Sequence, residues 1–436
     1  MRVWVRACHK PSANLAPMPS TEQIGGNQGN LLYQFSTYRA LAAEGIDLRS
    51  ISYGKLEKGD VDERAEWINS ECDHLVLPLS SSFRLQMLKN LKLWADLVER
   101  LTIPVTVVGI GAQLRLRDVR EETYLPSRVT GVIASPEQVA EHEAAARRFV
   151  TAVLDRSSSI GVRGEISSRY LQYLGFPSNR IDVIGCPSLF MWGPQLRQVT
   201  VDQPALDARS RLSLSFDHRI NPTANLLEKT VDEFPKAMVY VQEKMAAQLV
   251  IAGEETRPDW AGDRRFPVYR DHPLYRQHRM EYLPTGWAWI RHMGGYDFAF
   301  GPRLHGTVAA TLAGTSAHLL VHDSRTLEVA QFHSLPHSLI ERIDEISSAH
   351  DVAARQDYSR YHSEYPALFA NFVDFLARNQ LRSGYTDGGT ALAAFDASIE
   401  KPSRAAAVVS AVPAQQPREG LMRRVKRVVR RVLPVR

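Results

Sequence analysis

Short apolar runs alternate with segments of helical periodicity along most of the chain. Each run ends in Gly, Pro, Ser or Asp, and the segments between runs repeat apolar residues every three or four positions. This alternation is typical of β/α units stacked around a parallel sheet. In the first half, the pattern predicts strands at 73–82, 103–113 and 180–190, helices at 85–101 and 136–156, and a strand, turn and helix over 159–175.

The alternation lapses into a polar connection at 194–211 and then restarts. For the second half we expect strands at 211–217, 248–254, 296–300 and 317–323, and helices at 234–246, 307–313 and 326–333. A chain of 436 residues exceeds the size at which one core usually keeps growing. We therefore expect domains at 1–195 and 205–395, with the functional site in the cleft between the two sheets.

Composition favours a globular cytoplasmic protein. The chain is 44% hydrophobic and 23% charged. Its three cysteines, Cys8, Cys72 and Cys186, are far apart and odd in number, which suggests neither a disulfide framework nor a zinc site. The first residues lack the apolar core of a signal peptide, and no apolar run is long enough to span a bilayer.

The C-terminal region differs from the rest in composition. Residues 400–420 are rich in Ala, Pro, Ser and Gln and predict a flexible linker, whereas residues 421–436 form a basic amphipathic stretch. Seven of the 53 basic residues lie in this tail, so the body has 46 basic against 48 acidic residues and no nucleic-acid partner is expected. The tail either lies on an anionic membrane surface, peripheral to the inner face of the cell membrane, or is a disordered basic segment.

Two turns place an arginine between a strand and a helix. Arg303 and His305 follow the apolar run at 296–300 and precede a helix of very small side chains, and Arg163 lies between two glycines in the 159–175 unit. Backbone N–H groups and the helix dipole favour anions at such turns. We expect the two arginines to close on one anion from opposite sides of the cleft.

A Gly- and Asn-rich loop precedes the first apolar helix. Gly29 allows close approach of the backbone to a ligand, while Asn27 and Asn30 can cap the helix or donate hydrogen bonds. A plain capped turn explains the same residues.

Five segments, in this order and spacing, resemble the polysaccharide pyruvyl transferase family over about residues 22–337. They are GGNQGNLL, VVGIGAQ, GVRGEISSRYLQYLG, VIGCPSLF and GPRLHGTVAATLAGTSAHLLVHDSRTLEVAQFHSLPH. The resemblance implies an α/β fold similar to GT-B glycosyltransferases, with two Rossmann-like domains. It also implies transfer of pyruvyl from phosphoenolpyruvate to a saccharide as a cyclic ketal, without a metal, a further cofactor or a nucleotide sugar.

By this resemblance, the residues that bind phosphoenolpyruvate are Arg163, Arg303 and His305, assisted by backbone N–H groups near Leu304 and Gly306 and by the Asn27, Gly29 and Asn30 loop. His305 is expected to donate a proton or to bind phosphate as a cation, because a neighbouring anion helps it keep its proton. The alternative is a buried histidine that caps the following helix. Asn30 departs from the acid found in many relatives, which puts a catalytic role for that position in doubt.

The general base is left open among four acids near predicted strand ends: Asp217, Glu254, Glu255 and Asp323. His318 and His322 fall in one predicted strand, where a four-residue interval separates side chains by about 13 Å, too far to share one metal ion. Aromatic residues at 257–292 either form an acceptor platform or pack onto the second domain.

These observations predict an enzyme that ketalates a lipid-linked saccharide during exopolysaccharide or cell-wall assembly, as a monomer or an oligomer. A glycosyltransferase that uses a nucleotide sugar is the enzymatic alternative, and a saccharide- or anion-binding scaffold is the non-catalytic one.

Overall fold

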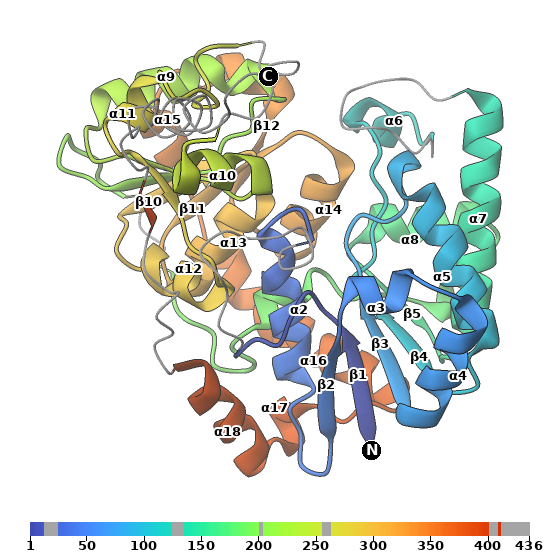
Figure 1. The fold of residues 1–436 in the computed structure, drawn as a ribbon. Helices are drawn as coiled ribbons and strands as arrows, with labels where there is room; N and C mark the ends of the chain where they lie inside the picture. The colour runs from blue at the N-terminus through green and yellow to red at the C-terminus, as the bar shows by residue number, and fades with distance from the viewer. Residues whose placement is uncertain (13–24, 124–134, 200–203, 255–262, 401–408, 411–436) are drawn as a thin grey trace, which may run out of the picture.

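The structure, a computed structural model, describes residues 1–12, 25–123, 135–199, 204–254, 263–400 and 409–410. Two mainly parallel sheets, each flanked by helices, form the two halves of the molecule (Figure 1). This architecture confirms the predicted α/β, GT-B-like class. Glu255, the tail at 421–436 and most of the linker at 400–420 lie outside the described residues.

The first sheet has the strand order β2-β1-β3-β4, and the pair β5-β6 continues it. The N–H groups of Gly109 and Ile110, just after β4, donate to the carbonyl of Gly161 in β5 at 2.9 and 3.1 Å. The buried runs of Val, Leu and Ile in β3, β4 and β5 suit a parallel sheet covered on both faces. The bounds are β1 (Arg2–Arg6), β2 (Asp47–Ile51), β3 (His74–Pro78), β4 (Val105–Val108), β5 (Ile160–Val162) and β6 (Ile181–Val183).

Helices cover both faces of this sheet. On one face α5 packs against α7, with the rings of Trp94 and Phe149 5.8 Å apart. The helices are α2 (Gly29–Ala40), α3 (Tyr53–Glu57), α4 (Val61–Glu71), α5 (Leu88–Arg100), α6 (Leu116–Arg120), α7 (Pro136–Leu154) and α8 (Glu165–Tyr173).

The second sheet has the order β12-β11-β10-β7-β8-β9-β13, and its named pairs are parallel except β13 with β9. Its strands are β7 (Leu212–Leu214), β8 (Met238–Tyr240), β9 (Met280–Tyr282), β10 (Phe298–Gly301), β11 (Ala317–Val321), β12 (His337–Leu339) and β13 (Val409–Ser410). The helices are α9 (Ala224–Glu233), α10 (Lys244–Ala252), α11 (Pro273–Arg276), α12 (Gly286–Met293), α13 (Leu304–Ala313), α14 (Ser324–Phe332) and α15 (Ala349–Ala353).

One predicted pair of elements in the second half was wrong. The helix expected at 234–246 is strand β8 followed by the start of α10, and the strand expected at 248–254 lies mostly within α10. The run MVYV is rich in strand-forming residues and is enclosed between β7 and β9. The closing strand predicted at 180–190 is also shorter, because only Ile181–Val183 pairs and Pro187–Phe190 forms a 3-10 turn.

Helix α2 joins the two halves. It contacts β1 and β3 of the first sheet and α12 and α13 of the second half. All its residues except Asn30 are buried, because both sides of the helix face protein. The start of α2 is thereby fixed relative to both sheets.

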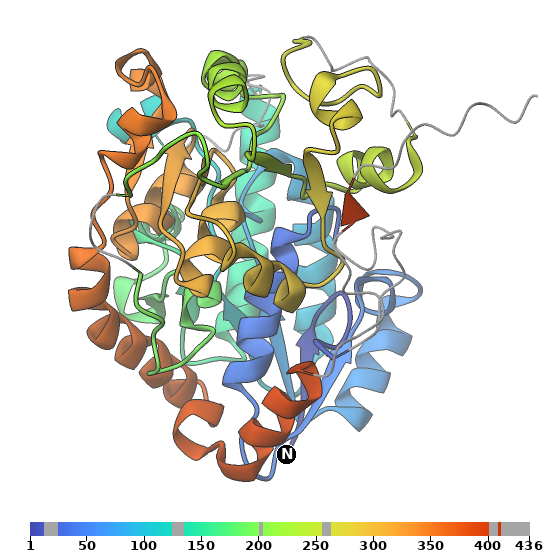
Figure 2. The ribbon, with the colours of Figure 1, turned by 90° about the vertical axis from the view of Figure 1, so that its left-hand side faces the viewer.

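The chain returns to the first half at its end. Helices α16 (Ser359–Arg378), α17 (Gly384–Asp387) and α18 (Gly389–Glu400) run along the lower side of the molecule toward the N-terminus (Figure 2). Arg39 of α2 binds Asp396 of α18 at 2.7 Å, and Asn379 bonds to the β5 region through Ser159. Helices α16 and α18 thus lie beside elements of the first half, while the domain bounds 1–195 and 205–395 stay a prediction. Among the described helices, none is long and apolar enough to cross a membrane.

Candidate active site

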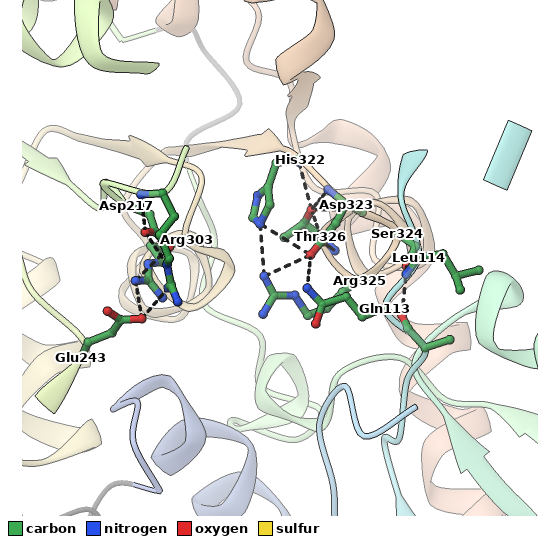
Figure 3. A network of polar contacts seen from close by, with 12 residues as sticks. Gln113, Leu114, Asp217, Glu243, Arg303, His322, Asp323, Ser324, Arg325 and Thr326 are labelled. Carbon is green, nitrogen blue, oxygen red and sulfur yellow. Dashed lines mark hydrogen bonds and ion pairs between the residues drawn. The ribbon is translucent and has the colours of Figure 1, made fainter. Parts of the chain in front are cut away.

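Loops from the carboxyl ends of both sheets meet between the two halves. Leu114, in the loop after β4, exchanges two hydrogen bonds of 2.8 and 3.0 Å with Ser324 at the start of α14 (Figure 3). The N–H of Gln28, at the start of α2, donates to the carbonyl of Gln242 after β8 at 2.8 Å. These contacts bring the strand-end residues of both sheets into one region.

Arg303 follows β10 and is held by carboxylates of the second sheet (Figure 3). Its Nη2 lies 3.0 Å from Asp217 and 2.7 Å from Glu243. Arg219 pairs with the same two acids, at 2.8 Å and 2.5 Å. Arg303 is therefore part of a four-membered cluster in which two positive and two negative charges balance.

Arg163 has a different environment. Its side chain is 1% exposed, and its Nε donates to the carbonyl of Gly109 at 2.7 Å while its guanidinium carbon lies 5.3 Å from the centre of the Tyr33 ring. It ties together the loops that follow β4 and β5. The clamp formed by Arg163 and Arg303 thus remains a prediction, and each arginine already has partners within the protein.

His305 lies beside the first turn of α2. Its ring packs on Gly29, and the Tyr33 ring centre is 6.1 Å away. The Nε2 atom is buried without a hydrogen-bond partner among the described residues. Burial lowers the pKa of His305 well below its ordinary value, and the charges of Arg163 and Arg325 lower it further. Without a bound anion the neutral form of the imidazole is favoured; the protonated His305 expected beside an anion stays a prediction.

The Gly- and Asn-rich loop forms the start of α2. The side chain of Asn27 accepts a 2.8 Å hydrogen bond from the N–H of Gly29, and Asn30 donates to the carbonyl of Gly25 at 2.9 Å. These bonds match the capped turn that the sequence also allowed. Gly29 does provide a close approach, but the group that approaches it is His305.

The first turn of α13 was expected to offer backbone N–H groups near Leu304 and Gly306. The N–H of Gly306 already donates to the carbonyl of Arg303 at 2.9 Å. Gly306 is needed for packing, because a Cβ there would lie 2.1 Å from the Ser215 hydroxyl. The N–H of Leu304 has no partner in the part of the chain that is described.

Two of the four proposed bases, Asp217 and Asp323, have lowered pKa values. The two arginines hold the pKa of Asp217 well below its usual range despite burial, and Asp323, which caps α14 and pairs with Arg325 at 3.3 Å, has its pKa lowered to about 2. Glu254 is exposed beyond the far end of α10, about 13 Å along the helix from the site. Glu255 is not among the described residues.

Arg84 is the functional candidate that the sequence did not suggest. It follows β3 in the segment SSSFR, and its side chain makes no hydrogen bond or ion pair with any described residue. Burial and the nearby charge of Arg325 lower its pKa. Arg325, from the second half, contacts His322 and Asp323 through Nη2 only, while its Nε is buried without a partner. The charge of a guanidinium from the second half thus acts on one from the first half, and each has an Nε without a partner among the described residues.

The region has an excess of positive charge. The imidazoles of His305 and His322 have lowered pKa values. Five guanidinium groups therefore oppose three ionised carboxylates: Arg84, Arg163, Arg219, Arg303 and Arg325 against Asp217, Glu243 and Asp323. A fourth acid, Glu328 of α14, is fully buried and accepts hydrogen bonds from the N–H and hydroxyl of Ser167. Burial raises the pKa of Glu328 to about 8, so it is neutral at pH 7. The arrangement suits an anion.

The remaining sequence candidates have structural roles. Tyr282, Trp287 and Trp289 of the aromatic segment are buried, and Trp289 stacks on Tyr240 with ring centres 4.5 Å apart, so packing explains them. Trp260 lies outside the described residues. His318 bonds to the hydroxyl of Ser338 at 2.9 Å, and no group of three metal-ligating side chains occurs within the described ranges.

Two α/β halves whose strand-end loops meet in a region rich in arginine define a fold of the GT-B-like class. The family model for polysaccharide pyruvyl transferase matches residues 30–324, about two thirds of the sequence, and this stretch contains Arg84, Arg163, Arg303 and His305. The chain belongs to this family of transferases.

Comparisons with curated proteins and solved structures do not define the function further. Among curated proteins, none matches this chain. Similar solved structures include UDP-GlcNAc 2-epimerases from Neisseria meningitidis (12% identity, TM-score 0.41, covering 92% of this chain and 100% of that one) and Methanocaldococcus jannaschii (11%, 0.43, 80% and 93%). A third is UDP-N-acetylglucosamine 2-epimerase from Rickettsia bellii (12%, 0.42, 87% and 98%). Such low similarity says nothing about the substrate of this chain.

Proposed function

We propose that the protein transfers pyruvyl from phosphoenolpyruvate to two hydroxyl groups of a saccharide, forming a cyclic ketal. The observation that supports this most is Arg84 of the first half, whose Nε is buried without a partner among the described residues and whose pKa is lowered by burial and by the charge of Arg325 from the second half. Half-buried guanidinium groups of this kind bind phosphate and carboxylate groups with charge-assisted hydrogen bonds. Phosphoenolpyruvate has one group of each type.

The reaction requires proton transfers that the site is suited to make. One acceptor hydroxyl adds to C2 of the donor while C3 gains a proton, and the C2–O bond to phosphate then breaks. The second hydroxyl attacks C2 and completes the ketal. The acceptor gives up two hydroxyl protons. One accounts for the proton added to C3, and the other leaves with phosphate as hydrogen phosphate.

His305 is the group that we assign to the first proton transfer. A neutral imidazole with an unpartnered Nε2 can accept a proton from a hydroxyl, whereas Asp217 and Asp323 are already paired with arginines. The imidazolium formed is adjacent to the bound anion, which stabilises it, and it can deliver the proton to C3. Arg163 and the Leu304 N–H complete the donor site.

Loss of Arg84 should weaken donor binding. Arg84→Ala removes a charged hydrogen-bond donor, so the Kd for phosphoenolpyruvate should rise about 10- to 100-fold. Arg169→Ala removes an exposed guanidinium of α8 and should leave the Kd unchanged. Calorimetric titration measures the Kd, and phosphate release with a saccharide present measures turnover. An unchanged Kd in Arg84→Ala would contradict the assignment, and a wild-type protein that does not bind phosphoenolpyruvate would contradict the function itself.

The acceptor is proposed to be lipid-linked, and the protein peripheral to the inner membrane surface. The basic amphipathic pattern at 421–436 supports this setting, because each cation near an anionic surface contributes about 1 kcal/mol. Deleting residues 421–436 should abolish sedimentation with anionic vesicles, with turnover on a soluble acceptor retained. Neutral vesicles serve as the control, and equal sedimentation of both proteins would exclude this role of the tail.

A further inference from the structure

The first turns of α14 are hydrogen-bonded to the first half of the molecule. The hydroxyl of Ser324 donates to the carbonyl of Ala112 at 3.0 Å and accepts from the N–H of Leu114 at 2.8 Å, both in the loop after β4. One turn further along α14, the carboxyl oxygens of Glu328 accept from the N–H and the hydroxyl of Ser167 in α8, at 3.0 and 2.9 Å. The Ser167 hydroxyl also accepts from the N–H of Ala112 at 2.8 Å. These bonds join one helix of the second half to two strand-end segments of the first.

Glu328 is packed tightly against the turns on either side of Arg163. Glu328 is 2% exposed. A Cβ on Gly111 would lie 2.9 Å from Oε1 of Glu328 and 3.3 Å from Cδ of Arg163. A Cβ on Gly164, which follows Arg163 in the chain, would lie 2.6 Å from the Cβ of Glu328. The two glycines therefore allow Glu328 to approach the loops that Arg163 joins.

The contact has to resist repulsion between cations of the two halves. Arg163 lies in the first half and Arg325 in the second, and the charges of both lower the pKa of His305. The charge of Arg325 also lowers the pKa of Arg84. Because like charges repel, these side chains favour separation of the halves until an anion is bound. Hydrogen bonds that do not depend on a net charge can hold α14 in place against this repulsion.

Glu328 makes these bonds as a neutral acid at pH 7. The charged groups that act on it are Arg163, after β5, and Asp323, at the start of α14, while α8 provides the two donors of Ser167. Burial raises the pKa of Glu328 to about 8. A neutral carboxyl accepts both hydrogen bonds without cancelling the charge of Arg163, so that charge stays available to an anion.

We infer that Glu328 is a positioning residue of the donor site, which ties the helix of Arg325 to the two loops that Arg163 joins. The inference rests on the proposed function for the identity of the donor. Glu328 acts on the donor through the two arginines. With α14 held in place, their guanidinium groups are already arranged for an anion, and less free energy goes into ordering them on binding.

Donor binding and the neutral acid favour one another. The charge of Arg163 lowers the pKa of Glu328, and a bound anion cancels that charge. The donor therefore raises the pKa of Glu328 further. By linkage, ionisation of Glu328 weakens donor binding.

Removing the hydrogen bonds tests the tie. Glu328→Leu accepts no hydrogen bond, so the Kd for phosphoenolpyruvate at pH 7 should rise at least about tenfold. Glu328→Gln keeps an oxygen for the N–H of Ser167 and should stay within about threefold of the wild type. Glu341→Leu is the matched control, because Glu341 binds Arg120 of the other half through an exposed ion pair; its Kd should not change. Calorimetric titration of the full chain measures each Kd, and thermal unfolding shows which variants are folded.

A variant on the other side of the contact tests the same tie if Glu328→Leu does not fold. Ser167→Ala removes the hydroxyl that donates to Glu328 and accepts from Ala112, and it should raise the Kd about three- to tenfold. A folded Glu328→Leu or Ser167→Ala protein with the Kd of the wild type would overturn the inference.

The pH dependence of donor binding separates positioning of the donor site from general stabilisation of the fold. Above pH 7 the phosphate group of the donor is almost fully ionised. The Kd of the wild type should rise about fivefold from pH 7 to pH 9 if the bound donor raises the pKa of Glu328 from about 8 to about 9. Glu328→Gln does not titrate and should lack this rise, and parallel profiles would overturn the inference.

Inorganic phosphate serves as a second probe of the same variants. Phosphate binding that responds to them as stated, in a wild type that does not bind phosphoenolpyruvate, would support the inference and contradict the proposed function.

Discussion

Adding one methyl group to Gly29 should displace the imidazole that we place at the reaction centre. Gly29 begins α2, and the side chain of His305 packs directly on it. A Cβ on Gly29 would lie 2.5 Å from Nδ1, 2.7 Å from Cγ and 2.8 Å from Cβ of His305. Because the Cβ of His305 is itself too close, rotation of the ring does not relieve the overlap. Helix α13 or α2 has to shift.

The size of the shift follows from these distances. Ordinary contacts begin at 3.4 Å, so His305 must retreat by about 0.9 Å. Misplacement of a reacting group by about 1 Å can lower kcat about 100-fold. Overpacking typically costs about 1–3 kcal/mol of stability. The better helix propensity of alanine offsets up to about 1 kcal/mol of that cost.

Gly29→Ala should therefore lose far more activity than stability. Phosphate release under saturating donor and acceptor measures kcat, and thermal unfolding reports the stability. Gly294→Ala is the matched control, because its Cβ would meet the carbonyl of Arg291 at an ordinary 3.4 Å and the residue lies at the end of α12. A folded Gly29→Ala protein with the kcat of the wild type would refute the view that the position of His305 limits turnover.

Two further substitutions test the packing and the electrostatics around the site. Gly306→Ala places a Cβ 2.1 Å from the Ser215 hydroxyl, so the free energy of unfolding should fall by about 1–3 kcal/mol. Urea unfolding should show that adding Ser215→Gly restores this free energy. If the double variant is no more stable than Gly306→Ala, another contact causes the loss. Glu328 keeps its proton up to a pKa of about 8 when folded but titrates near 4.5 when unfolded, so its contribution to wild-type stability falls as pH rises from 5 to 8. Glu328→Gln does not titrate, so its stability relative to wild type should rise over this range by at most about 1.4 kcal/mol per pH unit, and parallel pH profiles would contradict the neutral carboxyl.

The elements that the sequence predicted well have local signals. The apolar run before Arg303 and the small residues after it define β10 and α13, with Gly314 ending the helix at a φ of 83°. The run QLVIAG was misassigned because a short apolar run does not distinguish a strand from a buried helix. Gly253, which ends α10 at a φ of 65°, was the signal available for the correct choice.

The roles of the arginines were harder to predict, because they depend on partners far away in the sequence. Arg303 and Arg163 share a Gly-flanked turn after a strand, yet one binds two carboxylates and the other binds backbone carbonyls. Neither Asp217 nor Glu243 is close to Arg303 in the chain. Arg84 has no flanking glycines, and only the fold shows that the charge of Arg325 acts on it.

This difference in partners separates two functions within one set of cations. A guanidinium that two carboxylates already neutralise, such as that of Arg303, gains little from a second anion, and its fixed geometry makes it suitable for orienting a neutral acceptor. A half-buried guanidinium that lacks a carboxylate partner, such as that of Arg84 within the field of Arg325, is destabilised until an anion arrives, so part of this cost returns as binding free energy. Loss of Arg84 should therefore affect donor affinity first, whereas loss of Arg303 would leave Asp217 and Glu243 with one cation fewer and disturb the cluster that they form with Arg219.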